Sequence, residues 1–169
     1  LNLVLCKNCT LVQLRETTPP GKLYNDHYGY RSGINRTMQD ELRTIVSEAL
    51  LHTSIQEGDI VVDIGANDGT LLSNYEHVTR IAFEPVSKFA KEIEKDKKAE
   101  IIVNDFFNLN AYRKQCTRRA KIITAISMFY DLDDPNAFVS DLVKILHYDG
   151  ILVIQQNYVG SMLSQMAFD

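Results

Sequence analysis

The feature that most constrains the fold of this chain is a regular alternation of short apolar runs with segments of helical pattern. Five runs rich in β-branched residues recur every 20 to 30 residues, at positions 60–64, 80–84, 100–103, 121–127 and 150–155. Strands that are almost wholly apolar, joined by helical crossovers, are typical of a parallel sheet covered on both faces. The pattern predicts an α/β fold: a doubly wound, Rossmann-like parallel sheet of about five strands with flanking helices.

Helix-start signals fill the gaps between these runs. Asn35 is a good N-cap, and apolar residues follow it at the spacing of one helical face. A second helix is predicted where Asp134 caps and Pro135 takes the first turn, with a buried face that extends to Leu146. Gly150 is expected to end the connection to the fifth strand.

Charge and length limit the classes of partner. Lys and Arg number 18 against 22 for Asp and Glu, so the formal charge is −4 and there is no broad positive field for a polyphosphate. We therefore expect no nucleic-acid partner. The apolar stretches are far shorter than the roughly 18 residues needed to span a bilayer, so we also expect no membrane partner. Three cysteines without a signal peptide indicate a reducing cytoplasm.

The most informative segment, 61–70, is predicted to pass from a strand through a glycine turn into a helix. A dinucleotide fingerprint would place glycines at 65, 67 and 70, but Asn67 and Thr70 stand at the last two positions. Such side chains serve a close pyrophosphate approach poorly. An acid closes the second run, where a ribose diol needs an acceptor. The remaining set suits a ribose-containing ligand without pyrophosphate: Asp63, Gly65, Gly69 and Glu84.

Polar and aromatic side chains also follow the later runs. Asp105 with Phe106 could hydrogen-bond and stack an adenine, and the mixed segment 127–131 is expected at the pocket rim. We interpret three nearby acids, Asp131, Asp133 and Asp134, as a solvated helix-capping cluster. Four hydrogen-bonding side chains follow the fifth run and are expected to face substrate: Gln155, Gln156, Asn157 and Tyr158.

Six segments together carry a resemblance to a known family. They are Cys6-Lys-Asn-Cys9 with Leu11 to Leu14, Tyr24 to Gly33, Asp63 to Gly69, Asn104 to Phe107, Met128 to Pro135, and Gln155 to Tyr158. On these segments the chain resembles the class I S-adenosylmethionine-dependent methyltransferases, and among them the sugar C-methyltransferases that act on nucleotide-linked keto-deoxysugars. The glycine motif alone indicates a methyltransferase, whereas the tyrosine-arginine segment and the final polar run indicate the sugar subgroup.

The resemblance implies S-adenosylmethionine as cofactor and assigns residues to its parts. The methionine half would be lined by Asp63, Gly65, Asn67, Asp68 and Gly69. Glu84, followed by Pro85, would bind the ribose hydroxyls, and Asp105 with Phe106 would hold the adenine. The rest of the cofactor site would be Tyr30, Arg31, Ser127 and Met128.

The resemblance also implies the reaction. A base removes a proton next to a ketone, and the enolate attacks the sulfonium methyl group, a step that requires no metal. Tyr28, Tyr30 and Tyr158 are the candidate catalytic donors to the enolate oxygen. Substrate binding is assigned to Gln155, Gln156 and Asn157. The His-Glu-His segment that supplies the base in the family is not among these residues, so we expect the base beyond Asp169.

The resemblance also implies that full-length members of the family carry a zinc-binding lobe. Cys6 and Cys9 are half of a four-ligand zinc site, so zinc is expected only in the full-length protein. We accordingly interpret the chain as a fragment, with 1–24 a remnant of the zinc-binding lobe and its linker, and 25–169 the S-adenosylmethionine-binding core. Its oligomeric state is not predicted.

Two other classes of function compete with a methyltransferase. A NAD-binding oxidoreductase domain is suggested by the glycine turn and Glu84 but opposed by Asn67 and Thr70. A non-catalytic remnant or interaction module is suggested by the incomplete metal site. Binding of S-adenosylhomocysteine, of NAD, or of neither ligand separates the three.

Overall fold

The predicted parallel sheet is present. The computed structural model describes residues 2–166. Within them one sheet contains β3 (Ile60–Ile64), β4 (Thr79–Phe83), β5 (Ile101–Val103), β6 (Ala120–Ile126) and β7 (Leu146–Gln155). The strand order is β5-β4-β3-β6-β7, and every neighbouring pair is parallel. The chain builds outward from β3 to β5 and then returns to add β6 on the other side of β3, so the topological switch point lies between β3 and β6.

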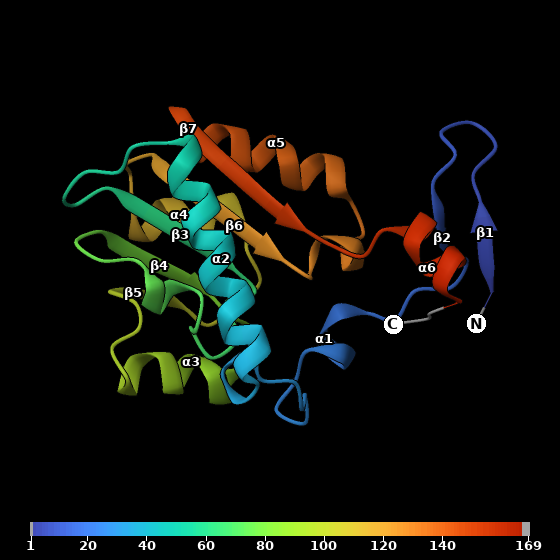
Figure 1. The fold of residues 1–169 in the computed structure, drawn as a ribbon, viewed down its shortest axis with the longest axis horizontal. Helices are drawn as coiled ribbons and strands as arrows, with labels where there is room; N and C mark the ends of the chain where they lie inside the picture. The colour runs from blue at the N-terminus through green and yellow to red at the C-terminus, as the bar shows by residue number, and fades with distance from the viewer. Residues whose placement is uncertain (1, 167–169) are drawn as a thin grey trace.

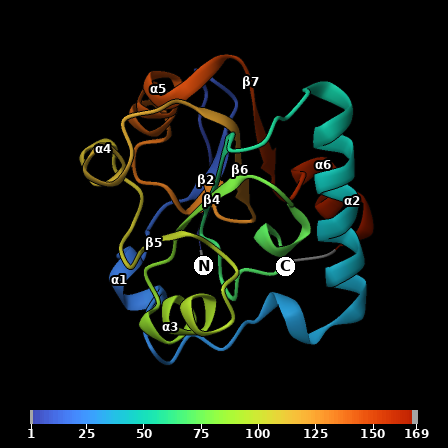
Figure 2. The same cartoon turned by 90° about the vertical axis from the view of Figure 1, so that its left-hand side faces the viewer.

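Helices cover both faces of this sheet, as Figure 2 shows. The helices α2 (Arg36–His52) and α3 (Ser87–Lys95) pack on one face. The helices α4 (Leu109–Gln115) and α5 (Pro135–Ile145) pack on the other. Alternate residues of each strand serve the two faces, so that Val61 belongs to the first apolar cluster and Val62 to the second. No helix within residues 2–166 is long and apolar enough to cross a bilayer.

The predicted helix starts are confirmed at two caps. The Asn35 side chain accepts a hydrogen bond from the Thr37 backbone N–H at 2.9 Å, and Asp134 accepts one from Ala137 at 2.9 Å. The boundary after α5 was predicted wrongly. The helix ends at Ile145, and Leu146 pairs with Ala120 in the sheet. Leu146 packs in the same apolar cluster from the strand as it would from a helix, so its hydrophobicity did not distinguish the two.

The expected helix after the glycine turn is also wrong. The segment forms only a short 3₁₀ helix, η2 (Leu72–Asn74), and Tyr75 after it is extended. The Asn74 side-chain amide donates to the carbonyl oxygens of Thr70 and Leu71, at 2.8 and 3.2 Å. Such side-chain bonds offer the backbone carbonyls an alternative to helical partners, which ends the helix early.

The leader forms a separate small sheet. The strands β1 (Leu3–Leu5) and β2 (Val12–Leu14) pair as an antiparallel hairpin, and α1 (Pro20–Leu23) follows. Figure 1 places the hairpin at one end of the molecule, the same end as α6 (Val159–Gln165). The predicted division between residues 24 and 25 stays a prediction.

Candidate functional site

The candidate site lies where the carboxyl ends of β3, β4 and β6 meet. Open α/β sheets bind ligands at this edge, next to the switch point. The segment 24–33, called the strap below, continues from α1 to the start of α2 past this edge (Figure 1). It ends within the 3₁₀ helix η1 (Ser32–Ile34), and another 3₁₀ helix, η3 (Phe129–Asp131), follows β6.

Glu84 follows β4 and holds the glycine turn. Its carboxylate Oε2 accepts the Asn67 backbone N–H and its Oε1 accepts that of Val86, both at 2.7 Å. The side chain is 4% exposed, and burial raises the pKa of Glu84 to about 7 against the opposing effect of these two bonds. Because a carboxylate oxygen has two lone pairs, each oxygen retains one for a further donor. This arrangement fits two adjacent hydroxyl groups.

Asp63 lies inside β3, one strand away. It is in register with Thr124 of β6, whose hydroxyl donates to Asp63 Oδ1 at 2.6 Å. Burial raises the pKa of Asp63 to about 7, and the bond from Thr124 partly offsets that effect. The carboxyl group therefore sits at the switch point without a cationic partner among the described residues.

The glycine turn joins these two acids. Gly65 has a φ of +77° and Gly69 a φ of +75°, a region where L side chains are strained. The backbone N–H groups of Gly65 and Ala66 both donate to the carbonyl oxygen of Phe83, at 2.9 and 3.0 Å. A Cβ at Gly65 would lie 3.5 Å from the Met128 side chain. The turn thus brings Met128, after β6, against the end of β3.

Asn67 and Asp68 bind the strap rather than facing open space. Asn67 Oδ1 accepts the Ser32 backbone N–H at 3.0 Å, and its amide donates to the Tyr30 carbonyl at 3.1 Å. Asp68 is 2% exposed, and its Oδ2 accepts the Gly33 N–H at 2.8 Å. Both side chains were predicted to contact a cofactor. Those contacts stay a prediction, and the structure shows that both side chains bond to the backbone of residues 30–33.

The other end of the strap is fixed by Tyr24. Its hydroxyl donates to Asp131 Oδ2, and its ring lies 6.2 Å edge-on from Phe106 and 5.2 Å from Tyr28. The half-buried Asp131 is therefore a partner of the strap, and the interpretation of it as part of a solvated capping cluster is wrong. Only Asp134 of that cluster caps α5.

Two cations of the site region hold the middle of the strap on α3. The Lys88 ammonium donates to the carbonyl oxygens of Asp26 and Tyr28, and Arg31 pairs with Glu92. Both cations also lie over the Phe89 ring, at 5.1 and 5.7 Å. Arg31, predicted to contact the cofactor, is therefore engaged with α3.

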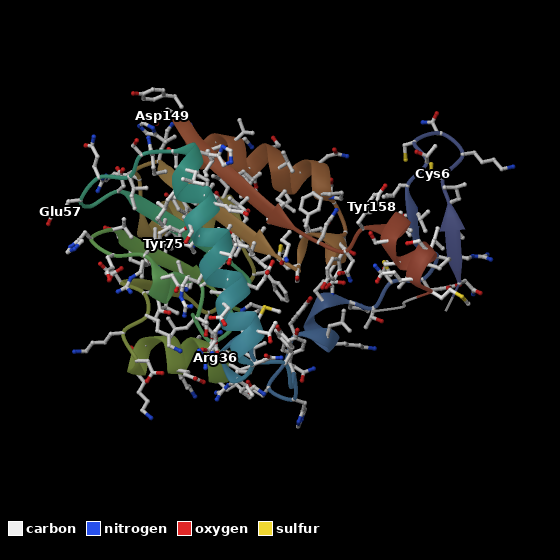
Figure 3. The ribbon with its side chains drawn as sticks, in the orientation of Figure 1. Cys6, Arg36, Glu57, Tyr75, Asp149 and Tyr158 are labelled. Carbon is white, nitrogen blue, oxygen red and sulfur yellow. The ribbon has the colours of Figure 1, made fainter. Side chains whose placement is uncertain are left out.

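Most of the predicted cofactor residues lie at the carboxyl edge of the sheet. The remaining predicted site residues differ in position and exposure. Asp105 and Phe106 are exposed after β5, and Ser127 begins the turn after β6 with a φ of +53°. Burial raises the pKa of the Tyr28 hydroxyl, and the charges of Tyr30 and Glu84 add smaller contributions. Gln156 and Asn157 are exposed, and Tyr158, 73% exposed, lies at the start of α6 (Figure 3).

Three residues of the site were missed by sequence reasoning: Tyr24, Lys88 and Thr124. A hydroxyl inside the apolar run 122–126 was a signal that could have identified Thr124. Lys88 gave none, because its contacts are to backbone carbonyls more than 50 residues away.

The two cysteines of the hairpin lie between β1 and β2, and Figure 3 labels Cys6 at its tip. The backbone N–H groups of Cys9 and Asn8 lower the pKa of the Cys6 thiol, which favours a metal-binding thiolate. Within residues 2–166 no group of three or more metal-ligating side chains converges. The described residues therefore do not complete a zinc site.

The comparison that decides the family is the match of residues 34–166 to the model of a family described as "Methyltransferase domain". The chain belongs to this family of methyltransferase domains. Its matched range contains Asp63, the glycine turn, Glu84 and Met128, but it begins after the tyrosines of the strap.

Individual relatives of this methyltransferase domain are distant. C-methyltransferase NovU of Streptomyces niveus is 23% identical over the whole of this chain and 40% of its own length. The plantazolicin methyltransferase BpumL, solved with a desmethyl plantazolicin analog and S-adenosylhomocysteine, has a TM-score of 0.62 at 14% identity, covering 79% of this chain and 52% of that one. N-methyltransferase NodS of Bradyrhizobium japonicum, solved with S-adenosylhomocysteine, has a TM-score of 0.56 at 13% identity, covering 72% and 63%.

These solved structures share the fold of this domain. The chain spans about 40% of the length of the curated relative, NovU.

Proposed function

We propose that this chain binds S-adenosylmethionine at the carboxyl ends of β3, β4 and β6 and serves a methyltransferase reaction. The observation that carries the proposal is the buried Glu84 carboxylate beside the glycine turn, with one lone pair left on each oxygen for the two ribose hydroxyls. Family membership supports it, as do the related folds solved with S-adenosylhomocysteine.

The other cofactor groups are assigned around Glu84. Asp63, Gly65 and Gly69 are proposed for the methionine end, with Asn67 and Asp68 holding the strap over it. The adenine is assigned to the space between Asp105 with Phe106 and Ser127 with Met128, next to Pro85. Phe106 is 40% exposed and could stack on a ring there.

The proposed acceptor is a nucleotide-linked keto-deoxysugar that is methylated on carbon. The resemblance of the strap and of the segment 155–158 to the sugar C-methyltransferases supports this choice, and so does the similarity to NovU. A small-molecule acceptor, a cytoplasmic location and the division into a partial zinc lobe at 1–24 and a core at 25–169 belong to the same proposal.

The bound cofactor would supply an electrophilic methyl group on a sulfonium. Tyr28 is the best placed of the proposed donors to an enolate oxygen, since it lies close to Glu84. Its hydroxyl carries the proton it must donate at neutral pH, as an ordinary tyrosine does, and burial raises its pKa further. Tyr30 is exposed at the same end, whereas Tyr158 lies further away, at the start of α6. The strap would close over the bound cofactor and limit the access of water to this edge of the sheet.

A NAD-binding role finds less support. The pyrophosphate of a dinucleotide binds at the N-terminus of an α-helix after the glycine turn, and only the short η2 follows here. Asn67 also fills the turn and bonds to the strap.

The ribose assignment is tested by Glu84→Gln, with Glu48→Gln on the exposed face of α2 as the matched control. At ~100 times its Kd, S-adenosylhomocysteine should add about 2.7 kcal/mol to the stability of the chain and raise its Tm by several degrees. We expect Glu84→Gln to lose most of this rise and Glu48→Gln to keep it. An equal rise in both variants would contradict the assignment.

The acceptor is tested by incubating the full-length protein, with the base that we expect beyond Asp169, together with a nucleotide-linked keto-deoxysugar and a cofactor carrying a ¹³C methyl group. A new methyl carbon bonded to a sugar carbon is the expected signal. Methyl transfer to oxygen or nitrogen, or to no sugar tested, would contradict the proposed acceptor while leaving cofactor binding to be judged by the first test.

A further inference from the structure

A buried hydroxyl lies next to the glycine turn without a partner. Tyr75, directly after η2, is 2% exposed, and its hydroxyl is the one buried side-chain polar atom without a hydrogen bond in the described part of the chain. Burying a hydroxyl without a bond destabilises a fold, so native proteins rarely leave one so. The other deeply buried tyrosine, Tyr112, follows this rule, because its hydroxyl donates to the Arg118 carbonyl at 2.8 Å.

The Asp63 carboxyl group lies on the same side of the sheet as Tyr75. Because side chains alternate between the two faces of a strand, Asp63 lies on the same face of the sheet as Val61. Val61 and Tyr75 both belong to the apolar cluster under α2. The charge of Asp63 acts on the Tyr75 hydroxyl and adds to the effect of burial in raising its pKa. The labelled Tyr75 in Figure 3 lies beside α2, over the strands.

The Asp63 carboxylate can accept a further hydrogen bond, and the Tyr75 hydroxyl can donate one. Asp63 Oδ1 accepts the Thr124 hydroxyl, whereas Oδ2 accepts no hydrogen bond from residues 2–166. The charge of Asp63 acts on two titratable groups, Tyr75 and, just after β4, Glu84. The side chains that α2 buries in the cluster, Leu42, Ile45 and Val46, are apolar. An acceptor oxygen that takes no hydrogen bond from residues 2–166 thus lies on the same face of the sheet as a buried hydroxyl that has no acceptor.

We propose that Tyr75 is a positioning residue for Asp63, to which it donates through one bridging water molecule when the carboxylate is ionised. Internal waters are held by two to four polar partners, and Tyr75 with Oδ2 of Asp63 supplies two. Donation to the ionised form would hold the carboxylate in one orientation at the end of β3. The proposal rests on the proposed function in that Asp63 is there assigned to the methionine end of the cofactor.

The direct test is the titration of the Asp63 carboxyl carbon, followed by NMR in ¹³C-aspartate-labelled protein without ligand. Losing a donor to the charged form should raise the Asp63 titration midpoint in Tyr75→Phe by about one pH unit. Tyr112→Phe removes a buried hydroxyl on the opposite face and should leave the midpoint unchanged. An unchanged midpoint in Tyr75→Phe, or an equal shift in Tyr112→Phe, would overturn the proposal.

A double-mutant cycle keeps the test independent of labelling. Tyr75→Phe should lower the denaturation midpoint at pH values above the Asp63 pKa, and the same change should have little effect in the Asp63→Asn background. A hydroxyl without any partner would instead give equal, stabilising effects in both backgrounds, which would overturn the inference. Because both tests use the unliganded chain, failure of S-adenosylhomocysteine to bind would contradict the proposed function alone.

Discussion

Two buried carboxyl groups, Asp63 and Glu84, set the electrostatics of the site. Burial raises the pKa of each to about 7, and the charge of Asp63 adds to the effect at Glu84. In the unfolded chain both return to the ordinary range near 4. Between those values the native state binds more protons than the unfolded state, so the free energy of unfolding must fall as the pH rises from about 4 to about 7.

This fall is measured by urea denaturation at pH 5 and pH 7. We expect a loss of about 1.4 kcal/mol per pH unit for each group in this window. Asp63→Asn should remove one group's share of the slope, whereas Asp26→Asn, at an exposed position of the strap, should leave the slope unchanged. A free energy of unfolding that rises between pH 5 and pH 7 would contradict the burial of these acids.

Gly69 is the position of the turn where a side chain is least tolerated. Its φ is +75°, and a Cβ would lie 3.0 Å from Lys98 Cβ and 3.1 Å from Ile93 Cγ1. Gly69→Ala should lower the free energy of unfolding by about 1–3 kcal/mol. Gly21→Ala, where a Cβ meets nothing within 4 Å, is the control and should be nearly neutral. Equal effects of the two changes in urea titrations would rule out this account of the turn.

At the scale of elements, the strap is held by contacts at its two ends and on α3. Tyr24→Phe removes the bond to Asp131 and should raise amide hydrogen exchange in residues 24–33 by up to about tenfold, while exchange in β3 stays slow. Tyr148→Phe, at a side chain that is 90% exposed, is the control. Peptide-resolved mass spectrometry reads both regions, and unchanged exchange in the strap would count against its attachment through Tyr24.

Local sequence signals predicted the two helix starts correctly, but they did not predict the end of α5 or the short length of η2. Asn35 and Asp134 bond to backbone N–H groups two and three residues away, so sequence alone identified these caps. Leu146 satisfies the same apolar cluster from a helix or a strand, and pairing with Ala120 decides between them. The early end of η2 depends on the side-chain bonds of Asn74, which compete with helix formation in a way that hydrophobic spacing does not express.

For the whole molecule, the alternation of apolar runs was enough to predict the parallel sheet. It also predicted which strand ends would meet, because all carboxyl ends of a parallel sheet lie at one edge. The arrangement of the strap was not predictable in this way. Its anchors join residues far apart in the sequence, such as Tyr24 with Asp131, 107 positions on, and Gly33 with Asp68, 35 positions on.

The central claim is that this edge of the sheet binds S-adenosylmethionine and not a dinucleotide. Isothermal titration of the chain with S-adenosylhomocysteine, and separately with NAD, tests it most directly. We expect saturable one-to-one binding of S-adenosylhomocysteine, weakened at least tenfold (about 1.4 kcal/mol) by Glu84→Gln, and no binding of NAD. Binding of NAD alone, or of neither ligand, would contradict the claim.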